Sequence, residues 1–303
     1  MKVLFVGLGS IAKKHINALR SIVSQVEVYA LRSSYRAECW KDIINLYSLE
    51  EVEKFHFDFA IISNPTSEHK KTLDSLKELN IPLFIEKPLY HKLSIEDTIA
   101  SIEERGIITY VACNLRFLDS LRFVKQYLLE NNIRINEVNV YCGSYLPEWR
   151  VGVDYKKNYS ALPELGGGVH IDLILELDYI YWLFGSPEST LNSFSNVSSI
   201  DIKSFDYANY CLRYPSFNVS VILNYYRRDT KRTLEIISEN ETIYVDLLKN
   251  RVTINDEIAY QSEKGIVDSY KDQLIYFLNC IKERTQTFNT ISDAYNVLQI
   301  CLE

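Results

Sequence analysis

The sequence lacks the features that mark membrane, secreted and nucleic-acid-binding proteins. It contains no run of about 18 apolar residues, the length that a membrane-spanning helix needs. Its first residues, MKVLFVGLGSIAKKH, reach glycine and lysine too soon for a signal peptide. The net charge is -7 and the basic residues are scattered, so there is no positive stripe for a phosphate backbone. We therefore expect a cytoplasmic protein that binds neither membranes nor nucleic acid.

The cysteines show no CxxC pair and no spacing typical of a metal site. They are Cys39, Cys113, Cys142, Cys211, Cys280 and Cys301. Scattered thiols of this kind are commonly buried core residues. The sequence therefore predicts no disulfide, no zinc and no other metal site.

Internal repeats, low-complexity tracts and a disordered linker are also missing. Hydrophobic residues make up 47% of the sequence and charged residues 24%, which is typical of a globular protein. A chain of 303 residues is too long for one simple core. We therefore predict two tightly joined domains, residues 1–118 and residues 119–303.

The first domain alternates strand-like and helix-like segments in the rhythm of βαβ units, which predicts an α/β fold with a parallel sheet and helices on both faces. The expected strands are residues 2–6, 26–31, 59–62, 82–85 and 108–113, and the expected helices are 10–23, 68–79 and 94–104.

The second domain changes to β-branched and aromatic segments with period-two character, which predicts an α+β domain with an open, mostly antiparallel sheet. The expected strands are residues 137–142, 205–214, 218–226, 232–238, 241–246 and 251–254. Helices are expected over residues 121–130, over 169–184 after a glycine triplet, and from 268 onward.

A glycine pattern follows the first expected strand. Gly7, Gly9 and Ala12 form GxGxxA at the start of a helix. The first glycine permits a tight turn, the second lets the backbone approach a pyrophosphate, and the small third residue allows close packing. The helix start, with Ser10 and Ile11, offers N–H groups and a positive dipole end to the phosphates. The pattern predicts a Rossmann dinucleotide-binding domain.

The end of the second strand bears on the choice of dinucleotide. An NAD enzyme usually presents an acidic residue to the ribose here, whereas an NADP enzyme presents a cation or a small hydroxyl to the 2′-phosphate. Arg32 is followed by Ser33 and Ser34, which can all bind a phosphate. We therefore favour NADP(H), with NAD(H) as the alternative. In the alternative interpretation, Arg32 is simply a solvated surface residue.

Several further motifs resemble one family of oxidoreductases over essentially the whole chain. They are GLGSIAKKH, IISNPTSEHKKT, EKPL at 86–89, NLRF at 114–117 and the block YLPEWRVGVDYKKNYSALPELGGGVHIDLILELDYIYWLFG. The sequence resembles the glucose-fructose oxidoreductase, inositol dehydrogenase and rhizopine-catabolism (Gfo/Idh/MocA) family. The last block resembles a branch that is often associated with making bacterial surface sugars.

The resemblance implies a Rossmann domain, an open mixed sheet and an active site between them. It places Lys87 of EKP near the nicotinamide and the reacting hydroxyl, where a lysine can stabilise negative charge or relay a proton. Pro88 then forms the turn that holds it, with a cis bond typical of the family. Without the resemblance, Lys87 is a surface lysine at a strand end.

Other residues are expected at the cofactor because they end parallel strands or belong to the family motifs. His69 matches a family histidine, but a packing or capping role suits it better than catalysis. The residues added to the cofactor site in this way are Asn64, Pro65, Thr66, His69, Glu86, Lys87 and Asn114.

The helix after the glycine triplet carries His170, Asp172, Glu176 and Asp178. Asp172 and Glu176 share a helix face, so we expect them to project together, with the other two pointing elsewhere. Paired carboxylates can bind sugar hydroxyls, and their repulsion can raise one pKa for acid–base catalysis. The alternative is an acid at a helix N-terminus and an ordinary exposed glutamate.

The same helix departs from the family pattern. The resemblance implies a histidine, acting as acid or base, at the position of Leu175. Either Lys87 with Asp172 transfers the proton, or His170 reaches in from the first helical turn, or the chemistry is weakened. The candidate catalytic residues are Lys87, Asp172, Glu176 and His170.

An aromatic and polar cluster precedes this helix on an expected loop. Aromatic faces stack on sugar rings, and arginine holds a carboxylate or phosphate in a bidentate manner, so the cluster suits an anionic sugar derivative. Alternatively, its aromatic residues plug a sheet edge or a subunit contact. With the acids and Lys87, the candidate substrate-binding residues are Arg116, Trp149, Arg150, Tyr155, Tyr159, Asp172 and Glu176.

The sequence thus predicts an NADP-preferring oxidoreductase that moves hydride to or from a carbohydrate carbon. Leu175 leaves open a non-catalytic dinucleotide- or sugar-binding regulator. A third alternative is an enzyme with a permanently bound cofactor and a net non-redox outcome. Because the second sheet would leave one face open, we expect a homodimer or homotetramer that packs through it.

Overall fold

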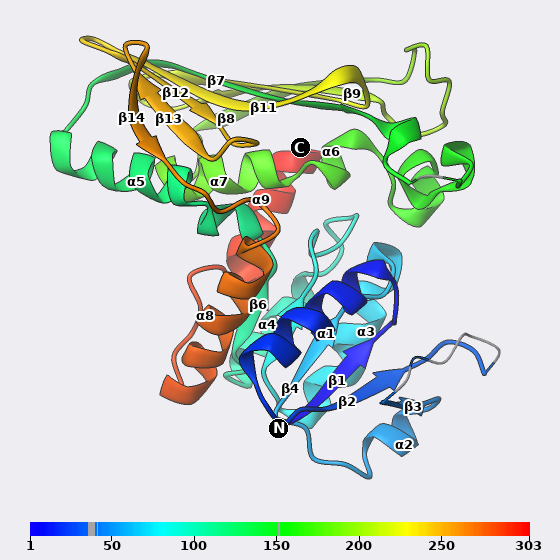
Figure 1. The fold of residues 1–303 in the computed structure, drawn as a ribbon. Helices are drawn as coiled ribbons and strands as arrows, with labels where there is room; N and C mark the ends of the chain where they lie inside the picture. Colours follow the sequence, from blue (N-terminus) through cyan, green and yellow to red (C-terminus); the bar gives the residue numbers. More distant parts are fainter. Residues whose placement is uncertain (36–39, 41, 151) are drawn as a thin grey trace. The chain divides into compact units, whose positions relative to one another are not determined.

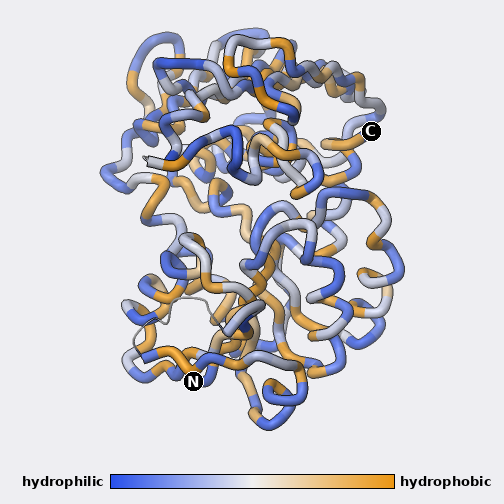
Figure 2. The backbone as a smooth tube through the Cα atoms, turned by 90° about the vertical axis from the view of Figure 1, so that its right-hand side faces the viewer, coloured by the Kyte–Doolittle hydropathy of each residue, from blue (hydrophilic) through white to orange (hydrophobic). Residues whose placement is uncertain are grey.

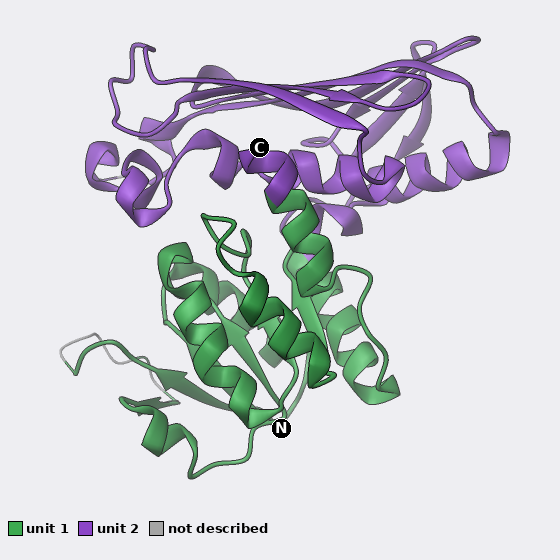
Figure 3. Cartoon of the chain, turned by 180° about the vertical axis from the view of Figure 1, so that it is seen from behind, with its two compact units in different colours: residues 1–112, 270–298 green, residues 113–269, 299–303 purple. Residues whose placement is uncertain are grey.

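The computed structural model describes residues 1–35, 40, 42–150 and 152–303 (Figure 1). These residues divide into two compact units (Figure 3). Unit 1 comprises residues 1–112 and 270–298, and unit 2 comprises residues 113–269 and 299–303. Neither unit is one continuous stretch of chain. Within the described residues, no helix has the length and apolar character needed to cross a membrane.

Unit 1 contains a six-stranded sheet in the order β3-β2-β1-β4-β5-β6, and all neighbouring strands are parallel. The strands are β1 (Lys2–Val6), β2 (Glu27–Leu31), β3 (Ile43–Leu46), β4 (Phe59–Ile62), β5 (Leu83–Ile85) and β6 (Thr109–Val111). The predicted parallel sheet is confirmed, with β3 as a strand that we did not expect. The order reverses between β1 and β4, which is where sheets of this type bind their ligand.

Helices cover both faces of this sheet, because alternate strand residues point to opposite sides and are apolar on both. On one face, Phe84 contacts the rings of His15 in α1 and Phe277 in α8. On the other, Leu4 and Ile62 lie in an apolar cluster with residues of α2, α3, α4 and α9. The helices are α1 (Ser10–Ile22), α2 (Leu49–Val52), α3 (His69–Leu76), α4 (Glu96–Glu104), α8 (Ser269–Glu283) and α9 (Ile291–Leu302). Figure 2 shows the hydropathy along the backbone, with hydrophobic (orange) stretches interspersed with hydrophilic (blue) ones.

Unit 2 contains an eight-stranded sheet in the order β14-β13-β12-β11-β7-β10-β9-β8. The strands are β7 (Ile135–Tyr145), β8 (Ser189–Ser195), β9 (Tyr207–Arg213), β10 (Asn218–Asn224), β11 (Tyr226–Ser238), β12 (Thr242–Asp246), β13 (Arg251–Ile254) and β14 (Glu257–Gln261). Among the described strands of this second sheet, only β7 and β10 pair in parallel, so the predicted mostly antiparallel sheet is confirmed.

The helices α5 (Asp119–Asn131), α6 (Val169–Asp172) and α7 (Leu175–Phe184) lie on one face of this sheet (Figure 1). We expected one helix over residues 169–184, but the structure divides it. Leu173 leaves the helical conformation, with φ -100° and ψ 25°. The turn that carries Asp172 is therefore set apart from the one that carries Glu176.

Between β7 and α6 the chain forms four short 3₁₀ helices, and two of them hold Tyr155 and Tyr159 of the predicted aromatic cluster. The four are η4 (Leu146–Glu148), η5 (Tyr155–Lys157), η6 (Tyr159–Ala161) and η7 (Pro163–Leu165).

Five cysteines lie in the described residues and all are free thiols. Four are buried, as the sequence predicts, and the fifth is exposed; Cys39 lies outside the described residues. The buried thiols are Cys113, Cys142, Cys280 and Cys301, and the exposed one is Cys211.

Candidate functional site

The glycine turn after β1 has room for no other residue at its first position. Gly7 has φ +85°, a conformation that L side chains rarely adopt. A Cβ added to Gly7 would lie 2.9 Å from the Cα of Asn64, where β4 ends. The turn therefore brings the ends of β1 and β4 into direct backbone contact at the point where the strand order reverses.

The second glycine and the start of α1 leave space and hydrogen-bond donors for an anion. Gly9 caps α1 with an ordinary φ of -79°, and a Cβ there would meet no described atom within 4 Å. In the described structure, no side chain caps this helix and its first turn holds no acid. Ala12 is fully buried, as close packing of helix and strand requires. Backbone N–H groups in the first turn, near Ser10 and Ile11, therefore fit a pyrophosphate.

A hydrogen-bonded arginine stands at the end of β2. The Nη1 atom of Arg32 donates to Oδ1 of Asn45 in β3 at 2.8 Å, and the side chain is half-buried. Ser33 and Ser34 follow and are exposed. Arg32 is therefore hydrogen-bonded to the neighbouring strand rather than freely solvated.

The chain after β4 is fixed by Asn64 and His69. The Nδ2 atom of Asn64 donates to Oγ1 of Thr72 at 2.8 Å, while its buried Oδ1 has no partner in the described structure. The ring of His69 is buried between the carbonyl oxygens of Asn64, Pro88 and Leu89. Burial lowers the pKa of His69. The structure thus gives His69 the packing role and leaves it no free nitrogen for a cofactor.

Three more of the predicted cofactor residues, Pro65, Thr66 and Lys87, are at least partly exposed. Pro65 is exposed and Thr66 is half-buried where η1 (Thr66–Glu68) begins. Lys87 is half-buried, and the bond between it and Pro88 is cis, as the family resemblance implies.

The neighbouring acid of the EKP motif is buried and paired within unit 1. Oε1 of Glu86 is hydrogen-bonded to Nε2 of His15 in α1, and both side chains are buried. We expected Glu86 at the cofactor, but its carboxylate instead ties β5 to the helix behind the glycine turn. Both residues stand in the motifs GLGSIAKKH and EKPL, although the sequence alone did not indicate that they pair.

In unit 2, Asp172 is held by two tyrosines. The carboxylate is 5% exposed, and its Oδ2 accepts a hydrogen bond of 2.5 Å from the phenol of Tyr225, which is fully buried. The phenol of Tyr159 also lies in hydrogen-bonding range of this carboxylate. Burial, assisted by the charge of Asp172, raises the pKa of both phenols. Tyr225 was not predicted, because it lies 53 residues from Asp172 and only the fold brings them together.

Two of the predicted substrate residues contact the tyrosines that hold this carboxylate. The Trp149 ring meets the Tyr225 ring edge-on at 5.3 Å, and its Nε1 donates to Oγ of Ser144 at 2.9 Å. The guanidinium of Arg150 lies 5.2 Å from the centre of the Tyr159 ring. The Nη1 atom of Arg150 is buried without a partner among the described residues. The structure therefore brings Trp149, Arg150 and Tyr159 together, whereas the phenol of Tyr155 donates to the backbone oxygen of Ile200.

Two of the predicted substrate residues lie inside the unit instead. Both Oε atoms of Glu176 accept from Arg232, at 2.5 and 3.0 Å, and Glu176 is fully buried. Arg116 is likewise buried, and its guanidinium binds both oxygens of Asp178 at 2.6 and 2.8 Å. The expected pairing of Asp172 with Glu176 and the expected substrate contact of Arg116 are therefore not what the structure shows. A buried carboxylate without a counter-charge would strongly destabilise the fold, and in each case an arginine supplies that charge.

Two further predicted residues are also buried. His170 packs against the rings of Phe194 and Phe205, and burial lowers its pKa to about 4. It is therefore a neutral core ring at pH 7. Asn114 is buried in unit 2, and its Nδ2 donates to Oγ of Ser269 at 2.8 Å.

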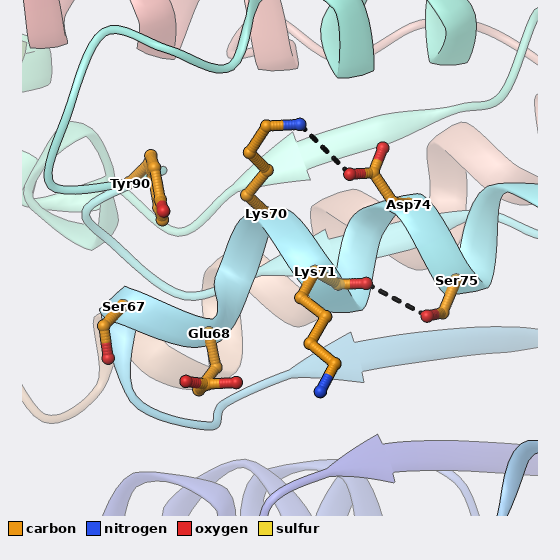
Figure 4. A pocket seen from close by; sticks show the side chains of 7 residues that line it. All are labelled: Ser67, Glu68, Lys70, Lys71, Asp74, Ser75 and Tyr90. Carbon is orange, nitrogen blue, oxygen red and sulfur yellow. Dashed lines mark hydrogen bonds and ion pairs between the residues drawn. The ribbon is translucent and has the colours of Figure 1, made fainter.

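A separate hollow of about 480 Å³ lies along α3 in unit 1 (Figure 4). It is lined by Ser67, Glu68, Lys70, Lys71, Asp74, Ser75 and Tyr90. None of the predicted site residues lines it, and Lys70 is paired with Asp74 at 3.1 Å. This hollow is therefore distinct from the residues predicted for the dinucleotide.

Comparisons with solved structures show which proteins share this fold. A myo-inositol 2-dehydrogenase from Lactobacillus plantarum is 20% identical, with a TM-score of 0.81 over 99% of this chain and 95% of that chain. A levoglucosan dehydrogenase in complex with NADH and levoglucosan is 15% identical, with a TM-score of 0.85 over 99% and 95%. A UDP-N-acetylglucosamine 3-dehydrogenase from Acidithiobacillus ferrooxidans is 17% identical, with a TM-score of 0.79 over 100% and 95%.

Comparison with curated protein sequences gives no match. Residues 1–112 match the family model described as "Oxidoreductase family, NAD-binding Rossmann fold". This stretch contains the glycine turn, the order-reversing strands β1 and β4, and the EKP motif. The match confirms, for residues 1–112, the resemblance to the glucose-fructose oxidoreductase, inositol dehydrogenase and rhizopine-catabolism family of oxidoreductases.

Proposed function

We propose that the protein transfers hydride between a nicotinamide dinucleotide and a carbon of a carbohydrate or sugar derivative, in cytoplasmic sugar or surface-glycan metabolism. The observation that carries this proposal is the glycine turn at the strand-order reversal, where Gly9 opens onto free space at an uncapped helix start. The dinucleotide, when bound, supplies or accepts the hydride.

We assign the binding of the dinucleotide to residues of unit 1. The turn and the first N–H groups of α1 bind the pyrophosphate, and Asn64, Pro65 and Thr66 border it at the end of β4. The guanidinium of Arg32, fixed by Asn45, favours a 2′-phosphate and therefore NADP(H) over NAD(H). Ser33 and Ser34 add hydroxyl donors beside it.

Proton transfer is assigned to Lys87 with Asp172. Of the candidate catalytic groups in unit 2, His170 is a neutral core ring and Glu176 is neutralised by Arg232, so Asp172 is the one that has acceptor oxygens near exposed side chains. Trp149, Arg150 and Tyr159 suit a sugar that carries an anionic group, because Arg150 keeps a buried Nη1 without a described partner.

The hydride transfer is tested with purified protein, NADP⁺ and NAD⁺. The first probes are myo-inositol, levoglucosan and UDP-N-acetylglucosamine, which the names of the structural neighbours supply. We expect a rise of reduced-nicotinamide absorbance with at least one sugar or sugar derivative, and its loss in Lys87→Ala while nucleotide binding persists. A fully active Lys87→Ala would remove Lys87 from the mechanism.

Leu175, at the position where the resemblance implies a histidine, favours a second candidate function: a non-catalytic dinucleotide- or sugar-binding regulator. Tight NADP(H) binding without hydride exchange across a wide sugar panel would support it. Nucleotide that stays with the purified protein would instead support a permanently bound cofactor and a net non-redox reaction.

We also infer a homodimer or homotetramer that packs through the sheet of unit 2. The helices α5, α6 and α7 cover one face of this sheet, and a hollow of about 260 Å³ lies on strands β7, β10, β11 and β12. Light scattering tests this, since a mass of 35.3 kDa in solution would contradict it.

A further inference from the structure

We propose that Tyr159 and Asp172 form a proton relay that replaces the histidine missing at position 175, with Tyr225 as the residue that positions Asp172. The inference rests on the proposed hydride transfer and revises its proton route: Tyr159 takes the proton from the substrate in place of Lys87, and Lys87 stabilises the negative charge on the substrate oxygen. Tyr159, Asp172 and Tyr225 all lie in unit 2.

Tyr225 orients the carboxylate of Asp172 through a hydrogen bond. Its side chain is fully buried, its ring is held edge-on by Trp149 at 5.3 Å, and its phenol donates to Oδ2 of Asp172 at 2.5 Å. A buried phenol of this kind cannot reach a substrate, but it orients the acid. A carboxylate offers about four lone-pair directions, so Asp172 can accept further protons or hydrogen bonds.

Tyr159 is the phenol that a substrate can reach. Its side chain is 36% exposed, although its hydroxyl lies in hydrogen-bonding range of Asp172. The guanidinium of Arg150 covers its ring at 5.2 Å. Part of the Tyr159 side chain is therefore exposed, while its hydroxyl lies within hydrogen-bonding range of Asp172.

The glycine triplet explains how Tyr159 comes to lie over Asp172. A Cβ added to Gly167 would lie 2.0 Å from the backbone oxygen of Tyr159, so only glycine allows this approach. The next residue, Gly168, starts α6, whose last residue is Asp172. The triplet thus joins the backbone of the tyrosine directly to the helical turn that carries the acid.

The other titratable groups around Asp172 do not serve as proton carriers. His170 on the same turn is a neutral buried ring whose pKa is lowered to about 4. Arg150, on the segment before α6, carries a guanidinium, which donates hydrogen bonds and accepts none. The side chain of Leu175, at the start of α7, has no group that can donate or accept a proton. Tyr159 and Tyr225 remain as the phenols that contact the acid.

The relay moves one proton as a sugar alcohol is oxidised. The carbon-bound hydrogen leaves with two electrons as hydride to the oxidised nicotinamide of the proposed function. The substrate O–H bond breaks and its proton joins the oxygen of Tyr159, while the phenol proton passes to Asp172. The product is a carbonyl, and the acid ends protonated. Because the pKa of Tyr159 is raised, the two transfers occur together and no free phenolate accumulates.

The test compares Tyr159→Phe and Tyr225→Phe with Tyr127→Phe. The control removes a phenol that also donates to a carboxylate, Glu241, elsewhere in unit 2. With whichever of myo-inositol, levoglucosan or UDP-N-acetylglucosamine is oxidised, Tyr159→Phe should lower kcat about 100-fold or more and leave KM within about threefold. Tyr225→Phe should move the acidic limb of the pH profile upward by about one pH unit, because the charged acid loses a donor. Tyr127→Phe should change neither.

A kcat for Tyr159→Phe within about threefold of the wild-type value would overturn the relay. If the wild-type protein oxidises none of the three probes, the proposed function fails for them, and infrared spectroscopy then tests the relay in the free protein. The carbonyl band of the protonated acid, identified by its loss in Asp172→Asn, should titrate at higher pH in both tyrosine variants than in Tyr127→Phe. Equal midpoints in all three variants would also overturn the relay.

Discussion

Arg232 of β11 binds both carboxylate oxygens of Glu176 in α7, at 2.5 and 3.0 Å, and this pair lies inside unit 2. The pair joins the central part of the sheet to the helix layer. It also explains why Glu176 is not a partner of Asp172, since a fully buried carboxylate takes the cation that the fold brings to it.

We expect Glu176→Gln to destabilise unit 2 by about 3–5 kcal/mol, because it leaves the Arg232 charge buried without its counter-charge. Urea unfolding followed by circular dichroism measures this. The control is Glu188→Gln, which breaks the exposed pair with Arg213 at 4.0 Å and should change the free energy of unfolding by less than about 1 kcal/mol. Equal effects of the two substitutions would contradict the buried ion pair.

An added methyl group should have different effects at the two glycines of the turn: it should lower stability at Gly7 and weaken nucleotide binding at Gly9. Gly7→Ala should destabilise unit 1, because φ is +85° and the Cβ would lie 2.9 Å from Asn64. Gly9→Ala should leave thermal unfolding unchanged, since no described atom lies within 4 Å, yet weaken NADPH binding by about tenfold or more, or about 1.4 kcal/mol. Normal nucleotide affinity in Gly9→Ala would mean that the pyrophosphate does not approach this residue.

The fold was largely predictable because its signals are local. The spacing of Gly7, Gly9 and Ala12 and the apolar runs on either side indicate a strand, a turn and a helix without any tertiary information. β3 was missed because it has only four residues, of which just the first and the last are buried, so it shows no period-two pattern. β8 was missed because it is rich in serine and largely not buried.

The candidate site was predicted less well, because its decisive contacts join distant segments. Trp149, Arg150 and Tyr159 stand close together in the sequence, on the segment that leads from β7 to α6 and Asp172. Nothing local indicates that Tyr225 reaches Asp172, that Arg232 takes Glu176 or that His15 takes Glu86. Helical spacing grouped Asp172 with Glu176, but the break at Leu173 separates them.

His170 predicts a pH dependence of stability. Its folded pKa of about 4 lies below the unfolded value of 6.5, so the unfolded state binds more protons between these values. The neutral His170 ring therefore contributes its full share to the free energy of unfolding above pH 6.5. This contribution, on the order of 3 kcal/mol, is lost as the pH falls toward 4. His170→Leu should therefore lose less stability than the wild-type protein between pH 7 and pH 4.

Urea unfolding at several pH values measures that difference. The control is His56→Leu, whose histidine is exposed in unit 1 and which should show the wild-type slope. A wild-type slope in His170→Leu would show that the buried ring does not titrate as its surroundings require.

The central claim, that unit 1 binds a nicotinamide dinucleotide and prefers NADP(H), is tested most directly by nicotinamide fluorescence titration with NADPH and NADH. The protein is first checked for nucleotide that is already bound. NADPH should bind more tightly, and Arg32→Ala should weaken NADPH about tenfold or more while leaving NADH nearly unchanged, because only the 2′-phosphate needs the guanidinium. If neither nucleotide binds and none co-purifies, the turn does not serve as a cofactor site and the oxidoreductase proposal fails.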